Sequence, residues 1–345
     1  MGMAAYPCRI VNASLREARA IEKDVMRIVK RLLVLTLLAL PAGLAAQSFP
    51  AKPVKLVVPF PAGGGVDVLA RVVGQKMGAA IGQPVLVENR AGATGIIGGE
   101  YVANAAPDGY TVLVATPGPM TIAGAAGRKL GFDPLKSYAP ISMGVWLTPL
   151  LVAANDADFT DVRALIAAAR AKPGGLTFAS GGVGNSQHLA GEMFAQMAGV
   201  RMVHVPFQGT APALQGVIGR QVDVFFSDPS ALPLVAGGKL KVLAVSSPTR
   251  SARLPNVPTV AEAGLPGFEY RNWYGFVAPA HTPRDVVSLL NRELHKALAD
   301  ADVQARLSAA GMEIAPDTPE AFAAFLAQDL ARWARVIKSG SMKLE

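Results

Sequence analysis

A strand, a glycine-rich turn and a helix start follow one another in residues 55–71, KLVVPFPAGGGVDVLAR, and this stretch constrains the fold most. Leu56–Val58 is short, apolar and β-branched, which predicts a buried strand. Two prolines and three consecutive glycines interrupt the pattern over Pro59–Gly65, and helical spacing resumes from Val66. Such a turn leaves backbone N–H groups unpaired in front of the helix, an arrangement that binds anions. The alternative is a tight turn that needs glycine for its dihedral angles and binds nothing.

Residues 1–46 predict a leader that is not part of the fold. Basic residues between Arg27 and Arg31 precede the apolar run Leu32–Leu40, and small residues follow up to Ala46. This order is typical of a secretory signal peptide, here residues 26–46. The apolar run is shorter than the roughly 20 residues that span a bilayer. Residues 1–25 would then be an upstream extension, and cleavage would leave an exported chain that starts near Gln47.

Composition excludes several function classes once the leader is set aside. The chain has 33 basic and 25 acidic residues, and removing the leader lowers the net charge from +8 to +4. No cluster of basic residues with interleaved aromatics remains, so nucleic-acid binding is not expected. Cys8 is the one cysteine and lies in the leader, which excludes disulfides and thiol catalysis in the exported chain. No later stretch predicts a transmembrane helix.

Strands and helices alternate along the rest of the chain, which is long enough for two domains. The pattern predicts an α/β fold with parallel sheets and helices on both faces. Two runs of units, each opened by a strand and a glycine-rich turn, suggest two lobes that face each other. Predicted strands cover residues 56–58, 85–88, 111–115, 139–146, 149–153, 177–179, 202–206, 222–226 and 240–245. Predicted helices cover residues 66–81, 95–105, 160–171 (with Thr160 as N-cap), 186–198, 210–218, 229–236, 284–299 and 320–337.

Most catalytic and metal-binding signatures are absent from the sequence. There is no G-x-x-x-x-G-K-[ST] phosphate loop and no G-x-S-x-G nucleophile turn. The four histidines have no metal-ligand spacing, so neither a metal site nor a cofactor is predicted. His188 follows a glycine-rich turn, and we expect it on a helix surface or behind the site.

Glycine-rich turns between a strand and a helix recur at residues 59–67, 88–99 and 179–188. Ligands of open α/β sheets lie beyond the carboxyl ends of the strands, so these turns should face one cleft. Neutral hydrogen-bonding side chains accompany the turns at Thr94, Thr116, Ser180, Asn185 and Ser186. Backbone N–H groups and hydroxyls can hold a carboxylate without a buried ion pair. The alternative role of each side chain is helix capping, which is strong for Ser186 and for Thr210.

The chain resembles the substrate-binding proteins of tripartite tricarboxylate transporters, the Bug-type receptors. The resemblance runs through KLVVPFPAGGGVDVLAR, VLVENRAGATGIIGGEYVANAAPDGYTVL, FASGGVGNSQHLAGEMF, HVPFQGTAPAL, GQVDVFFSD, LPNVPTVAEAGLPGFE and WYGFVAPAHTPRDVV. It implies a two-lobe type II periplasmic binding-protein fold, each lobe a mostly parallel sheet flanked by helices. Two crossing hinge segments are expected near Pro149–Ala153 and Gly275–Ala280. Residues 47–148 and 276–345 would form the first lobe, and residues 149–275 the second.

The resemblance places one ligand loop on Phe60–Asp67 and another on Ser180–Ser186, which in the family hold a carboxylate with bridging waters. Asp228 matches a cleft position of the family, where it would receive an amino or hydroxyl group of the ligand. It would alternatively cap the helix that starts at Pro229. The predicted ligand-binding residues are Phe60, Pro61, Ala62, Gly63, Gly64, Asp67, Thr94, Thr116, Ser180, Gly181, Gly184, Asn185, Ser186 and Asp228.

The function expected from the resemblance is that of a monomeric receptor in the periplasm. It would close on a small carboxylate (a dicarboxylate, an amino acid or an aromatic acid) and deliver it to membrane transporter subunits. A sensor that reports the ligand to a signalling partner is the first alternative. An exported enzyme on the same scaffold is the second, because a fold does not fix a function.

Overall fold

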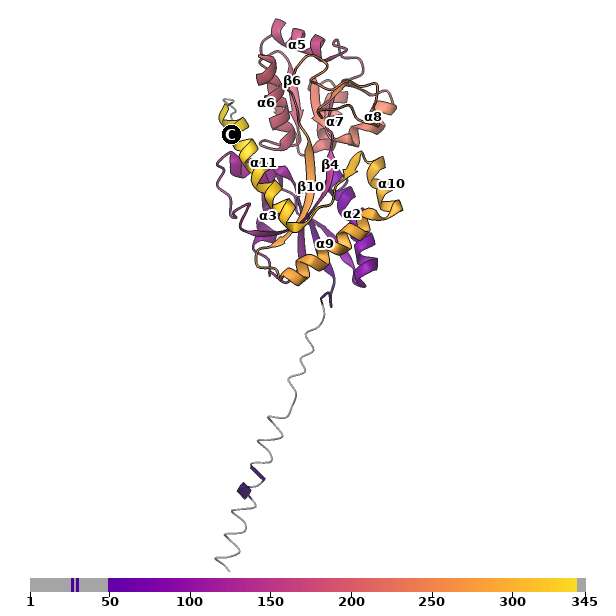
Figure 1. The fold of residues 1–345 in the computed structure, drawn as a ribbon. Helices are drawn as coiled ribbons and strands as arrows, with labels where there is room; N and C mark the ends of the chain where they lie inside the picture. Colours follow the sequence, from indigo (N-terminus) through magenta and orange to yellow (C-terminus); the bar gives the residue numbers. More distant parts are fainter. Residues whose placement is uncertain (1–25, 28, 31–48, 340–345) are drawn as a thin grey trace, which may run out of the picture. The chain divides into compact units, whose positions relative to one another are not determined.

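Two β-sheets, each flanked by helices, form the folded part of the chain in the computed structural model (Figure 1). The structure describes residues 26–27, 29–30 and 49–339. The expected signal peptide, its cleavage region and Cys8 therefore lie outside the described residues, apart from four positions between 26 and 30. No helix among the described residues is both long and apolar enough to cross a membrane.

The first lobe is built on a six-stranded sheet with the order β11-β4-β10-β3-β1-β2. Its strands are β1 (Val54–Val58), β2 (Val85–Asn89), β3 (Thr111–Ala115), β4 (Tyr138–Leu147), β10 (Asn272–Pro279) and β11 (Met312–Ile314). Its helices and turns are α2 (Gly65–Ile81), η1 (Ala93–Gly95), α3 (Ile96–Ala103), the π-helical turn η2 (Gly118–Ile122), α4 (Ala123–Ala125), α9 (Arg284–Ala299), α10 (Ala301–Ala309) and α11 (Pro319–Ser339).

The second lobe is built on a five-stranded sheet with the order β7-β6-β8-β5-β9. Its strands are β5 (Leu150–Ala154), β6 (Thr177–Ser180), β7 (Val203–Pro206), β8 (Val224–Ser227) and β9 (Leu240–Val245). Its helices and turns are α5 (Val162–Ala171), α6 (Ser186–Ala198), α7 (Thr210–Ile218), η3 (Pro229–Ala231) and α8 (Leu232–Ala236). The predicted two-lobe α/β class is thus confirmed.

Both sheets are mixed, which corrects the expectation of mostly parallel sheets. β1 pairs in parallel with β2 and β3, and β6 pairs in parallel with β7 and β8. The strands beside the lobe crossings run the other way: β10 is antiparallel to β3 and β4, and β5 is antiparallel to β8 and β9. A strand that leaves a lobe and one that returns to it run in opposite directions, so the crossings impose antiparallel neighbours.

The two crossings lie close to their expected places but not at them. The first is the two-residue connection Thr148–Pro149 between β4 and β5. The second lies at Arg271, just before β10, because the preceding residues up to Tyr270 still pack in the second-lobe core. The expected second crossing, Gly275–Ala280, instead lies largely within β10, which pairs with β3 and β4. The expected lobe boundary after residue 275 therefore falls inside a first-lobe strand. All eight β10 residues are buried, and hydrophobicity alone does not separate such a strand from a buried connection.

One helix contributes to the cores of both lobes. Phe322 and Leu326 of α11 pack with β3 and β10 residues in a first-lobe core cluster. Trp333, further along the same helix, packs in the second-lobe cluster with residues such as Leu165 and Phe178. Figure 1 shows α11 passing along the side of the molecule beside both sheets. Trp333 is accordingly buried.

Three helix starts differ from the predicted caps. Asp161, not Thr160, caps α5, because its Oδ1 accepts the N–H of Ala164. Asn185, not Ser186, caps α6 by accepting the N–H of His188 at 2.8 Å. α7 follows Gly209 and has no side-chain cap, so the hydroxyl of Thr210 does not act as one. The hydroxyls of Ser186 and Thr210 therefore do not serve as N-caps.

Candidate ligand-binding site

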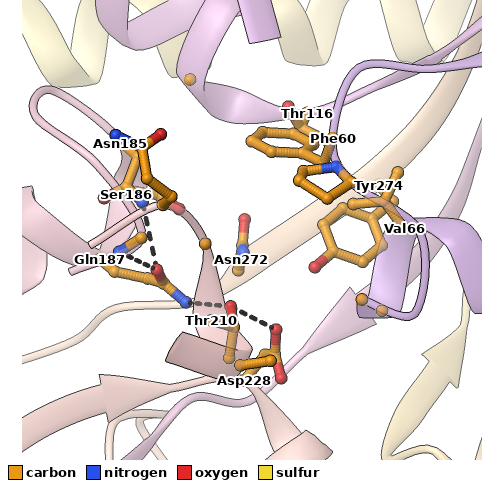
Figure 2. Close-up of a pocket in the computed structure, with 18 of the residues that line it drawn as sticks. Phe60, Val66, Thr116, Asn185, Ser186, Gln187, Thr210, Asp228, Asn272 and Tyr274 are labelled. Atoms are coloured by element: carbon orange, nitrogen blue, oxygen red, sulfur yellow. Dashed lines mark hydrogen bonds between the residues drawn. The ribbon is translucent and has the colours of Figure 1, made fainter. Parts of the chain in front are cut away.

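A small pocket lies between the two lobes, at the ends of strands from both sheets (Figure 2). It encloses about 120 Å³, on a scale where one water needs roughly 10–15 Å³, so a small organic molecule fits. Its lining residues are Phe60, Pro61, Ala62, Gly64, Gly65, Val66, Thr116, Pro117, Gly118, Gly181, Asn185, Ser186, Gln187, Gln208, Gly209, Thr210, Ala211, Pro212, Asp228, Asn272 and Tyr274.

The first wall is the turn between β1 and α2, from Phe60 to Val66. Gly64 precedes α2 with φ −82° and ψ 171°, and no side chain caps the helix. The first N–H groups of α2 therefore have no side-chain partner, and Gly64 and Gly65 bring this helix end directly to the pocket. Positive electrostatic potential at a helix N-terminus favours a negatively charged group there.

Asp67 fixes the shape of this turn and does not line the pocket. Its carboxylate accepts the N–H of Gly63 at 3.0 Å, two N–H groups of Arg71 and the amide of Asn89. Burial favours the neutral acid, but the bonds from Arg71, Gly63 and Asn89 outweigh it and keep the pKa of Asp67 below its usual value. The turn is thus held from behind by a charged carboxylate.

The second wall is the turn between β6 and α6, which continues into a line of hydrogen bonds along the pocket. Gln187 Oε1 accepts the N–H of Gly181 at 2.9 Å and the amide of Asn185 at 3.1 Å. Gln187 Nε2 donates to Thr210 Oγ1, which in turn donates to Asp228 Oδ2 at 3.3 Å, as Figure 2 shows. These bonds orient side chains from three separate segments of the second lobe around one cavity.

Charge is scarce in the pocket: its lining includes no lysine, arginine or histidine among the described residues, and Asp228 is the one carboxylate. Asp228 Oδ1 also accepts the N–H of Ser230 at 3.0 Å and so caps η3. Its helix-capping role is therefore present, and the same side chain faces the pocket. Burial, with the nearby Asp228 charge, raises the pKa of Tyr274 well above its usual value, so its phenol is a neutral hydrogen-bond donor.

Thr116 supplies a polar atom with no partner. It follows β3, is 3% exposed and lines the pocket, yet its Oγ1 has no hydrogen-bond partner among the described residues. Buried hydroxyls in proteins are normally hydrogen-bonded, so the unpaired hydroxyl makes Thr116 a candidate hydrogen-bond donor to a ligand.

The structure brings together many of the residues that the sequence predicted. Nine of them line the pocket: Phe60, Pro61, Ala62, Gly64, Thr116, Gly181, Asn185, Ser186 and Asp228. Four lie in the same two turns but outside the lining: Gly63, Asp67, Ser180 and Gly184. Thr94 lies in the third turn, residues 88–99, which contributes no lining residue, so that turn does not face the pocket as expected. Ser180 is fully buried behind its turn, where Oγ lies 2.6 Å from His204 Nε2.

Sequence reasoning missed Pro117, Gly118 and Gln187, which adjoin predicted residues, and two further groups of lining residues. Gln208–Pro212 follow β7, so the rule of ligands at strand ends, applied to that strand, identifies them. Asn272 and Tyr274 lie within β10 and reach the pocket because that strand enters the first sheet beside the crossing. No local sequence signal marks them. Among the described residues no group of three or more His, Cys, Asp or Glu side chains could hold a metal ion.

Comparison with known proteins gives a consistent assignment. The model of the tripartite tricarboxylate transporter family receptor matches residues 69–342. A protein encoded in the tcbD-tcbE intergenic region of Pseudomonas sp. strain P51 is 40% identical over 293 residues, which are 84% of this chain and 87% of that protein. Protein BugT of Bordetella pertussis is 35% identical over 327 residues, covering 93% of this chain and all of BugT.

Solved structures are similar over the same part of the chain. The periplasmic binding protein BugD has a TM-score of 0.80 at 35% identity, with 84% of this chain and 98% of BugD covered. MatC from Rhodopseudomonas palustris with bound malate has a TM-score of 0.79 at 33% identity, covering 84% and 100% of the two chains. Rpa4515 from R. palustris with adipate has a TM-score of 0.80 at 32% identity, covering 84% and 97%.

Proposed function

This chain belongs to the tripartite tricarboxylate transporter receptor family, and we propose that it is a periplasmic receptor that closes on a small carboxylate. The observation that carries the proposal is that the unpaired, buried hydroxyl of Thr116 and the uncapped N-terminus of α2 belong to the lining of one pocket. A carboxylate at this place accepts hydrogen bonds from both. The malate and adipate bound by two related structures belong to the same chemical class.

The far end of the ligand meets Asp228. Since no cationic side chain lines the pocket, a second carboxylate near Asp228 would face a like charge without compensation. An ammonium or hydroxyl group there would instead donate to Asp228, whose neighbours Thr210 and Ser230 donate to it already. Among the expected ligands, the carboxylate of Asp228 therefore favours amino acids and hydroxy acids over dicarboxylates that have no hydrogen-bond donor.

Thermal shift and calorimetry on the full chain test the proposal, with malate, adipate, an amino-acid set and aromatic acids as probes. A ligand at a hundredfold excess over its Kd stabilises the folded protein by about 2.7 kcal/mol. We expect binding without turnover. Binding should be lost in Thr116→Val and kept in Thr111→Val, a matched change at the first residue of β3. Conversion of a bound acid to a product would instead favour the enzyme alternative.

Delivery to membrane transporter subunits is the second part of the proposal, and family membership supports it. The sensor alternative makes a different prediction for cells that lack the gene. Loss of uptake of the bound acid supports delivery, whereas normal uptake with a lost transcriptional response supports the sensor. We expect the receptor to act as a monomer, which light scattering with and without the bound acid checks.

A further inference from the structure

Thr94 makes a direct hydrogen bond from one lobe to the other. It lies in η1, between β2 and α3 of the first lobe, and its Oγ1 donates to the carbonyl oxygen of Val183 at 3.1 Å. Val183 belongs to the turn between β6 and α6 in the second lobe. Thr94 itself is not among the residues that line the pocket. Its position therefore points to a contact between lobes and not to a contact with a ligand.

The backbone that presents Thr94 is strained. Ala93 has φ +45° and Thr94 has φ +57°, a left-handed conformation that non-glycine residues, and β-branched ones above all, rarely adopt. Conformations of this kind persist where the surrounding structure imposes them, and they concentrate at clamps and switch regions. The strain is thus a second observation, independent of the hydrogen bond, that sets this turn apart.

Glycines on both sides let Thr94 fit closely between the lobes. A Cβ atom on Gly182, in the second lobe, would lie 3.3 Å from Thr94 Oγ1, and Gly182 has φ +143°. A Cβ atom on Gly118, in the first lobe, would lie 3.3 Å from the carbonyl oxygen of Thr94. A larger residue at Gly182 would push the two turns apart and lengthen the bond to Val183.

Both partners of the bond connect to pocket walls. Behind Thr94, a Cβ atom on Gly95 would lie 3.3 Å from the ring of Phe60, and Phe60 lines the pocket. On the other side Val183 is followed two and three residues later by Asn185 and Ser186, which also line it. The bond therefore joins the second-wall turn to the η1 turn, which packs behind Phe60 of the first wall.

We propose that Thr94 is a positioning residue that stabilises the closed arrangement of the two lobes through its bond to Val183. It sets how readily the cleft opens, and hence how fast a bound molecule leaves, without touching that molecule. The link to ligand release rests on the proposed receptor function. The link to lobe closure stands on the interlobe bond itself and is measured without any ligand.

The test measures the distance between the lobes in the full chain without added ligand. Because Cys8 is the one native cysteine, a Cys8→Ser background allows a spin label on each lobe at the exposed residues Ala80 of α2 and Ala167 of α5, each changed to cysteine. Thr94→Val removes the hydroxyl but keeps the β-branched shape and the backbone strain. Thr94→Ser keeps the hydroxyl, and Thr160→Val is the matched control at an exposed threonine of the second lobe.

Removing one hydrogen bond of ordinary net strength changes the ratio of closed to open molecules by about fivefold. We expect a shift of that size toward longer distances in Thr94→Val, recovery in Thr94→Ser and no shift in Thr160→Val. Superimposable distance distributions for the parent and Thr94→Val overturn the proposal. If Thr94→Val does not fold, Thr94→Gly removes the hydroxyl and the strain together and is measured in its place.

Adding malate, adipate or amino acids to the same labelled proteins separates this proposal from the receptor function. If the interlobe distance changes in Thr94→Val but not on addition of any acid, the positioning role of Thr94 is supported and the carboxylate-receptor function is rejected. If the distance changes with an acid but not in Thr94→Val, the receptor function is supported and the role of Thr94 is rejected. When both respond, the dissociation rate of that acid rises by the same factor in Thr94→Val and recovers in Thr94→Ser.

Discussion

The imidazole rings of His188 and His204 stack on each other, with centroids 3.7 Å apart and planes inclined by 14°. The pair lies directly behind the second pocket turn: His188 Nδ1 accepts the N–H of Gly184 at 3.1 Å, and His204 Nε2 lies 2.6 Å from Ser180 Oγ. Glu192 Oε1 is the nearby carboxylate, 3.6 Å from His188 Nε2. Of the two expected placements of His188, the helix surface is wrong, because the side chain is buried. His188 instead lies behind the site, where it supports the second pocket turn.

Acid should destabilise the fold through this pair. Burial and the adjacent His188 lower the pKa of His204 to about 3, so the folded protein binds fewer protons than the unfolded chain between pH 3 and about pH 6.5. The free energy of unfolding therefore falls as the pH drops through this window, by up to about 2 kcal/mol from pH 7 to pH 5. Urea unfolding of His204→Gln should show a flatter pH dependence, whereas His281→Gln, an exposed control, should match the parent. Equal slopes in all three proteins would contradict this.

The buried carboxyl of Asp329 should give the free energy of unfolding the opposite pH dependence to that of His204. Its Oδ2 accepts bonds from Thr121 Oγ1 at 2.7 Å and Trp273 Nε1 at 3.1 Å, yet burial dominates and raises the pKa of its carboxyl. The folded state then holds this proton more tightly than the unfolded chain, so stability is lost as the pH rises above the usual value of 3.8. Asp329→Asn keeps an acceptor for both donors and should melt higher than the parent at pH 7 but not at pH 4. Asp329→Ala leaves both donors unpaired and should cost about 1–3 kcal/mol at either pH.

Two glycine substitutions should separate binding from folding. A Cβ atom on Gly64 would meet nothing within 4 Å, and its φ of −82° suits any residue, so Gly64→Ala should melt like the parent. The added methyl should still block close approach to the α2 N-terminus and weaken carboxylate binding about tenfold. A Cβ atom on Gly275 would lie 2.2 Å from the ring of Phe322, so Gly275→Ala should lose about 1–3 kcal/mol of stability. Calorimetry and melting curves on both variants check the pair; a lower melting temperature with normal affinity in Gly64→Ala would count against the pocket.

Asp228→Asn should change which acids bind. Neutralising the one carboxylate of the pocket removes its repulsion of a second ligand carboxylate, so adipate should bind about tenfold more tightly relative to amino acids. Asp223→Asn is the control, because Asp223 bonds to Thr177 N and Oγ1 and does not line the pocket. If the affinity for adipate relative to amino acids is unchanged in Asp228→Asn, Asp228 does not contact the ligand.

The sequence predicted element positions well and side-chain directions less well. Strand and helix bounds follow local hydrophobic spacing, and most predicted elements end within two residues of the observed ends. The strands β10 and β11 and the helix α10 were not predicted. The direction in which β4 and β10 pair depends on where the chain crosses between lobes, which no local pattern encodes. Thr94 and Ser180 were placed in the correct turns, but whether a hydroxyl points into the pocket, across the lobes or back toward His204 depends on the partner turn. Tyr274 reaches the pocket only through the pairing of β10, so spacing could not identify it.

The path of α11 gives the protein an internal optical signal. Phe322 is fixed in the first-lobe core and Trp333 in the second, so the lobes cannot rotate apart while both ends of the helix keep their contacts. The ring of Trp333 packs edge-on to Tyr270, the second-lobe core residue that directly precedes the second crossing, with centroids 6.2 Å apart. Any movement at this crossing alters the surroundings of that indole. Opening of the cleft should therefore change intrinsic tryptophan fluorescence, which makes ligand occupancy readable in the unlabelled protein.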